Sequence, residues 1–312
     1  MGKFKTITIF FCLLSSFVFA EELFVKPNQT VYLNLKKFKK ESDSVYSLYI
    51  KKLTLNNESV LFLPRDLSNK IAKITIEELH IHGKGYIAQS VRSNVNIVRH
   101  KGEVGLKEYF EDLIPRAEKG KDGERVNHER AKSGDGDKGR DGKDGKNGRS
   151  GISGIKELNL DINIASFGQL DVVLVGESGG HGGNGSDGQG GSHAECDRNR
   201  GANGGHGGNG GQGGFPGSVG AINITWQSDL PLITTGQIPF GLNVRQYAGL
   251  AGNPGNGGAG GSGGDSVRCG LWKRSGGNPG EPGRIGTSLR GGGDYIFFGR
   301  VGDVSIINKD MQ

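Results

Sequence analysis

Apolar side chains are scarce in this sequence. Hydrophobic residues make up 33% of its 312 residues, and aromatic residues make up 7%. This composition excludes a conventional α/β enzyme core of this length, because too little apolar surface is available for burial. The formal net charge of +6 is modest, so the composition is also not that of a highly charged disordered chain.

Long hydrophobic runs are almost as scarce. One apolar run at 7–19 follows Lys3 and Lys5 and ends at the small residue Ala20. This order predicts a secretory signal over 1–20. No second run of about 20 apolar residues indicates a membrane span. We therefore expect export to the periplasm, the cell surface or the extracellular space, with no transmembrane segment in the mature chain.

Cysteine is rare, with three residues in the chain. Cys12 lies in the expected signal, which leaves Cys196 and Cys269 after cleavage. An even number of cysteines in an exported protein predicts a disulfide, and two free thiols are the alternative.

Glycine, in contrast, is abundant, with 58 residues. One Gly-rich tract opens at Gly176 and another opens at Gly249, and each follows two short runs of alternating apolar and polar residues. Such runs predict strands, and an earlier copy of the plan precedes Gly102. The repeated order of strand, strand and excursion predicts an all-β fold, with a β-solenoid or sandwich-like strand core and a projecting polyglycine/polyproline II helix bundle.

Composition shifts divide the chain further. Leu106, Tyr109, Phe110 and Leu113 have helical spacing. The predicted parts are a signal at 1–20, a β-rich region at 21–100, a charged insertion with a short helix at 101–133, a collagen-like Gly-X-Y stretch at 134–155, strand pairs with two Gly-rich hairpin arms (176–220 and 249–293) over 156–293, and C-terminal strands at 294–312.

The glycines of the arms recur every third residue, which is the period of a polyproline II helix. In 201–220 they form two series, one starting at Gly201 and one at Gly205, so two faces of this helix lack side chains. Its backbone groups have no internal partners, so we expect hydrogen bonds to adjacent helices. The third face carries His206, Asn209 and Gln212 here, and Asn184 in the outward arm, and suits solvent.

The turns of the two arms differ in chemistry from the arms. Cys196 and Cys269 lie at these turns, at equal distances along arms of equal length, so a disulfide would join the tips. Around them are cations, a histidine and a tryptophan that suit a sugar or an anionic glycan. The candidate ligand-binding residues are His193, Arg198, Arg200, Arg268, Trp272, Lys273 and Arg274. In the alternative, Leu271 and Trp272 pack against the disulfide and cap the bundle.

Several Gly-rich runs carry a resemblance to known families. The run at 204–214 resembles the polyglycine II bundles of springtail antifreeze proteins and of the receptor-binding adhesins of T-even-like phages, and 136–154 resembles a bacterial collagen-like segment. In the phage adhesins the loops between Gly helices touch the receptor. The resemblance thus implies that the two tips make the contact here.

These observations together predict an exported, non-enzymatic protein, a surface adhesin or an extracellular scaffold that contacts glycans, cell surfaces or matrix. We expect a monomer, with a trimer through 134–155 as the alternative, and no nucleic-acid partner, catalytic residue, cofactor or metal. His80 and His82 share a strand face but lack a third ligand. A secreted carbohydrate-active enzyme on a β-solenoid and an ice-binding protein are the other functions considered.

Overall fold

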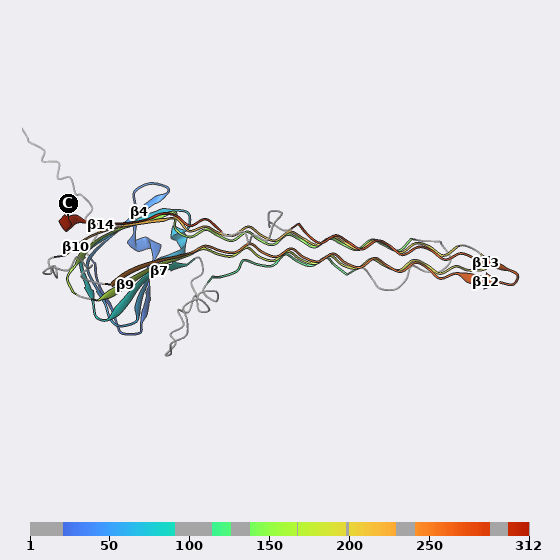
Figure 1. The fold of residues 1–312 in the computed structure, drawn as a ribbon, viewed down its shortest axis with the longest axis horizontal. Helices are drawn as coiled ribbons and strands as arrows, with labels where there is room; N and C mark the ends of the chain where they lie inside the picture. The colour runs from blue at the N-terminus through green and yellow to red at the C-terminus, as the bar shows by residue number, and fades with distance from the viewer. Residues whose placement is uncertain are drawn as a thin grey trace, which may run out of the picture.

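The computed structural model describes residues 21–90, 114–125, 138–166, 168–197, 200–228, 241–287 and 299–311. The predicted signal at 1–20, the predicted helix at 106–113 and Arg198 lie outside these residues. Figure 1 shows a strand-rich body at one end of the molecule and a long, narrow array of extended segments leading away from it.

Two parallel sheets form the body. The first has the order β1 (Glu21–Val25), β4 (Val45–Leu55), β6 (Ile71–Ile81), β8 (Glu157–Ile164), β10 (Ala221–Ser228) and β14 (Val304–Asn308), with β3 (Lys39–Lys40) antiparallel to β4. The second has the order β11 (Gly241–Tyr247), β9 (Gln169–Val175), β7 (Lys84–Ser90), β5 (Ser59–Phe62) and β2 (Thr30–Tyr32). Three short 3-10 turns, Leu35–Lys37, Arg65–Leu67 and Lys309–Met311, complete the body. The strand-rich fold predicted from the sequence is confirmed.

The hydrophobic core lies between the two sheets. Every second residue of β8 is buried, as its alternating sequence requires. Leu158 and Leu160 of this strand belong to the same buried cluster as Leu170 and Val172 of β9. Because consecutive strands alternate between the sheets, each pass of the chain adds one strand to both and extends the core by one layer.

Among the described residues, six extended segments form the long array beyond strands β7, β9 and β11, which we call the Gly array. Segments 114–125, 176–192 and 248–264 run outward, and segments 138–155, 201–220 and 276–287 return. Hydrogen bonds join the outward segments in one layer and the returning segments in another, and further bonds join the two layers. Figure 1 shows these layers extending together from the body to the tip.

The bonds within the Gly array recur at every third residue. The N–H groups of Gly182, Gly185 and Gly188 each donate to a carbonyl of the neighbouring outward segment at 2.8 Å. In 201–220, the series that contains Gly204 donates to 276–287, and the series that contains Gly205 donates to 176–192. The two side-chain-free faces of 201–220 thus contact separate neighbours, as predicted.

Glycine is required because the segments approach at backbone distance. A Cβ atom on Gly208 would lie 2.1 Å from the carbonyl oxygen of Lys143. Segments with neighbours on both sides, such as 201–220, carry two glycines per turn. The segment 138–155 borders the array and carries one. Glycine is therefore needed where a neighbouring carbonyl occupies the Cβ position, and 138–155, the first described segment of its layer, carries Lys143 at the position equivalent to Gly208.

The third face of each segment is exposed, as expected, but its side chains also bond to the array. The Asn209 N–H donates to Asp144 Oδ1 at 2.7 Å, and Asn209 Oδ1 accepts from the N–H of Arg284 at 2.9 Å. His206 stands between Asp141 and Glu281 in the same way. In each turn, one backbone N–H belongs to a residue on the third face. A short acceptor side chain of a neighbouring segment bonds to that N–H.

The first outward segment, 114–125, lies within the stretch that the sequence analysis assigns to a charged insertion. Gly120 and Gly123 donate to the carbonyls of His181 and Asn184 at 2.8 and 2.7 Å. The collagen-like stretch follows as the returning segment, and its glycines donate to 201–220 of the same chain. All three excursions thus contribute a pair of segments to the array.

We predict that Gly208→Ala destabilises the Gly array, because the new methyl group would overlap the Lys143 carbonyl. The expected loss in the free energy of unfolding is about 1–3 kcal/mol, measured by denaturant titration. Gly190→Ala is the matched control, since position 190 continues the outer register of Asp187 and His193. Equal losses in both variants would contradict the steric explanation.

We also predict that His181 makes the Gly array sensitive to acid. Its Nδ1 accepts from the N–H of Asn253 at 2.9 Å, so the ring must be neutral at that nitrogen. Burial, together with the charges of Arg116 and Lys119, lowers the pKa of His181. This contribution to stability is therefore complete above the ordinary histidine pKa and is lost as the pH falls through the lowered pKa of the folded state.

The variant His181→Asn keeps an acceptor that does not titrate, as Asn184 provides in the next turn. Thermal unfolding between about pH 7 and about pH 5 should show the wild type losing stability relative to this variant. A stability difference that does not change with pH would show that His181 titration has no part in the array.

Candidate functional site

The far end of the Gly array carries a small hairpin. Its strands β12 (Val267–Cys269) and β13 (Trp272–Arg274) pair antiparallel. Gly270 has φ 67°, a conformation that side chains disfavour, and it occupies the first position of the two-residue turn, where glycine is preferred in type II′ turns. The turn leaves the side chain of Leu271 fully exposed at the end of the molecule.

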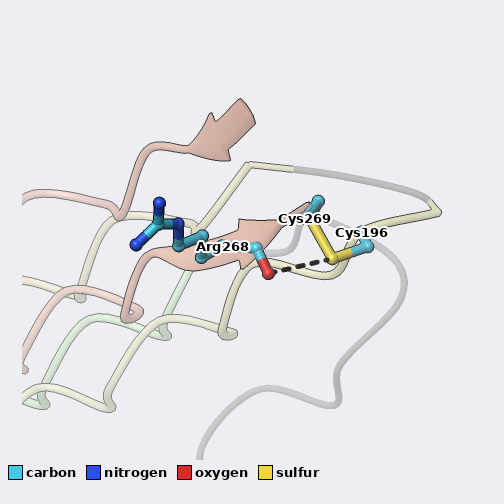
Figure 2. Close-up of a disulfide and its surroundings, with 3 residues drawn as sticks. All are labelled: Cys196, Arg268 and Cys269. Atoms are coloured by element: carbon cyan, nitrogen blue, oxygen red, sulfur yellow. Dashed lines mark hydrogen bonds between the residues drawn. A yellow bond between two sulfur atoms is a disulfide. The ribbon is translucent and has the colours of Figure 1, made fainter. Parts of the chain in front are cut away.

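A disulfide joins this hairpin to the turn of the neighbouring excursion. Cys196 and Cys269 have their sulfur atoms 2.01 Å apart and their Cα atoms 5.5 Å apart. Figure 2 shows the bond beside the hairpin backbone, with the Cys196 sulfur 3.8 Å from the carbonyl oxygen of Arg268. The pairing predicted from the sequence is present in the structure.

The predicted ligand-binding residues take different positions at the tip. Trp272 is 51% exposed, and the Arg274 guanidinium lies 4.9 Å from the centre of its ring, in cation–π contact. The side chains of Arg200, Arg268 and Lys273 are exposed to solvent. The structure therefore brings an aromatic ring and several cations to one end of the molecule.

The structure changes two expectations for the residues at the tip. His193 Nδ1 lies 3.1 Å both from the N–H of Asp265 and from its carboxylate, so His193 continues the side-chain bonds of the array. The alternative has Leu271 and Trp272 packed against the disulfide. It is wrong for Leu271, because the turn directs that side chain away from the protein.

A polar hollow lies beneath the hairpin, where the last outward segment turns back. Its volume is about 560 Å³. The hollow is open to solvent, and Lys273 contributes a cation to its lining. Its lining residues are Gly263, Gly264, Asp265, Ser266, Lys273, Ser275, Gly276 and Gly277.

Sequence reasoning missed a charged cluster on the outer face of the second sheet. Asp171 is buried there, with Lys84 Nζ at 3.4 Å and Arg245 at 3.5 Å, and its carboxylate accepts from the side-chain amides of Gln169 and Asn243. The carboxylate is only 1% exposed, so the cluster suits charge pairing between adjacent strands better than contact with a substrate. The polar residues that β9 and β11 place side by side, Asp171 and Asn243, were the available signal.

Comparison with protein-family models finds no match, and comparison with curated proteins finds none either. A search of solved structures finds a springtail antifreeze protein from Granisotoma rainieri, described as a bundle of nine polyproline type II helices. The similarity covers 50% of this chain and 97% of that one, at 24% identity and a TM-score of 0.13. No helix in the described part of the chain is long and apolar enough to cross a membrane.

We predict that removal of the disulfide by Cys196→Ser and Cys269→Ser lowers the free energy of unfolding. The chain-entropy model gives about 4 kcal/mol for a loop of this length. Equilibrium unfolding of the oxidised protein and the double variant measures this loss. Adding a reductant should destabilise the wild type and leave the variant unchanged. A variant as stable as the oxidised protein would show that the array holds the tip together without the covalent bond.

Proposed function

We propose that this chain is an exported binding protein of the adhesin type, in which the Gly array is a stiff spacer and its tip is the contact surface. The observation that carries the proposal is the placement of Leu271 and Trp272 in solvent at the end of the array, on the same hairpin as exposed Arg268 and Lys273. Solvent-exposed large apolar side chains rimmed by polar ones are typical of interaction sites.

The stiffness of the spacer follows from its bonding. Each inner turn donates to two neighbouring segments through its glycines, and its third N–H is accepted by a side chain. A segment bound on several sides at every turn has few ways to bend independently. The tip is therefore held at a fixed distance from the body, which suits contact with a second surface.

A glycan or a glycan-bearing cell surface is the ligand that we infer. The exposed Trp272 ring offers an apolar face for stacking on a sugar, and Lys273 and Arg268 attract an anionic group. The disulfide that stabilises the tip would persist in an oxidising compartment, which supports export. We further infer that the body is a two-sheet solenoid, since each pass of the chain adds a parallel strand to both sheets.

The double variant Trp272→Ala and Lys273→Ala tests the tip. We expect it to lose at least about ten-fold in affinity, because both the stacking face and a cation are removed. The measurement is binding of the oxidised mature chain to a glycan panel and to whole cells.

The matched control is Phe24→Ala with Lys26→Ala, which removes an exposed aromatic residue and a cation from the body. Circular dichroism confirms that each variant is folded. If the folded wild type binds no surface, or if both variants lose binding equally, the tip is not the contact surface and a scaffold role replaces the proposal.

A further inference from the structure

The returning segment 138–155 carries a cation at every third residue from 140 to 149, along one edge of the described array. These residues, Arg140, Lys143, Lys146 and Arg149, are all exposed, and we call them the basic ladder. The ladder lies along the side of the Gly array and includes none of the tip residues. It is therefore a second charged surface, distinct from the one in the proposed function.

The register of the array explains the direction of the ladder. The equivalent positions in the neighbouring segment are glycines, and a Cβ atom on Gly205 or Gly211 would meet the carbonyl oxygen of Arg140 or Lys146. Residues at this register thus point toward the preceding segment of their layer. Among the described residues, 138–155 is the first segment of its layer, so the ladder side chains extend outward from the array.

The backbone beneath the ladder is held at every step. The N–H groups of Lys146 and Arg149 donate to carbonyls of 114–125 at 2.8 and 3.1 Å. Lys143 and Arg140 lie nearer the tip of the array. Their N–H groups donate to Ser186 Oγ and Gln189 Oε1 of 176–192, at 2.8 and 3.2 Å. The four cations thus start from fixed points about 9 Å apart, the rise of three polyproline II residues.

The acidic residues of the same segment are placed elsewhere. Asp141 and Asp144 lie on the outer face, where their carboxylates accept from the N–H groups of His206 and Asn209. Arg149 also lies 3.4 Å from the buried carboxylate of Glu177.

The neighbouring segment 114–125 adds three charges at the same edge register, Glu118, Lys121 and Glu124. Five cations and two acids therefore share the edge, and its net charge is positive.

We propose that the basic ladder binds a linear polyanionic polysaccharide, one whose sulfate or carboxylate groups recur along the chain. A straight row of evenly spaced cations matches a polymer with evenly spaced anions, and such a surface attracts the polymer over several Å. Segment 138–155 contains no aromatic residue. Stacking on bases, which single-stranded nucleic-acid sites commonly use, has no platform there.

The test measures binding of immobilised dextran sulfate to the full oxidised chain. We expect the triple variant Arg140→Gln, Lys143→Gln and Lys146→Gln to weaken binding at least about ten-fold and to reduce its dependence on salt. The matched control changes the exposed body residues Lys36, Lys39 and Lys51 to Gln and removes the same charge. It should bind like the wild type, as should the tip variant Trp272→Ala with Lys273→Ala.

A second variant tests the proposal in the opposite direction. Glu118→Gln with Glu124→Gln removes the two acids from the edge and should strengthen binding, with folding checked by thermal unfolding. Three outcomes would overturn the proposal: no binding by the wild type, equal losses in the ladder and control variants, or equal affinity for dextran sulfate and single-stranded DNA. The tip variant separates this result from any failure of the proposed function.

Discussion

The Gly array depends on one steric condition, which is that a carbonyl oxygen occupies the space where a side chain would begin. At Gly205 and Gly211 a Cβ atom would lie 2.1 Å from the oxygen of the adjacent segment. Ordering glycine costs more conformational entropy than ordering any other residue, and the array has no side-chain core to offset that cost. Its stability must therefore come from close backbone packing and from hydrogen bonds made at every turn on several sides.

The body supplies the alignment that such an array needs. Strand β9 pairs with β11 at a register of 72 residues, as in Val175 with Tyr247. The same offset of 72 separates His181 from Asn253 and His193 from Asp265 along the array. The outward layer thus continues the register of the second sheet. Once the sheets form, the identical Gly-rich turns cannot slide past one another, and the disulfide fixes the other end.

The sequence predicts the strand pairs, the Gly faces and the cysteine pair because each leaves a local pattern. It does not predict that 114–125 is part of the array, since only Gly120 and Gly123 stand there among charged residues. The single glycine per turn of 138–155 is equally compatible with a collagen-like helix and with a border segment, because both need one bare face. At the tip, composition predicts the residue types. The contact of Trp272 with Arg274 depends on the hairpin that holds both, and the contact of His193 with Asp265 depends on how the two turns meet.

The same steric rule determines where side chains with useful chemistry can stand, namely the tip, the outer faces and the two borders. A border segment with unpaired backbone N–H and C=O groups can pair with another chain. Edge strands of β-sheets prevent such pairing with proline and charged residues. Pro279 and Pro282 occupy the edge register of the last returning segment and have no N–H to offer. At the opposite border, any bulky charged residue would prevent pairing with another chain, and Glu118 does so. Protection alone therefore does not explain why 138–155 has cations at four consecutive edge positions, from Arg140 to Arg149, and acids on its outer face. A polyanionic partner does explain that separation.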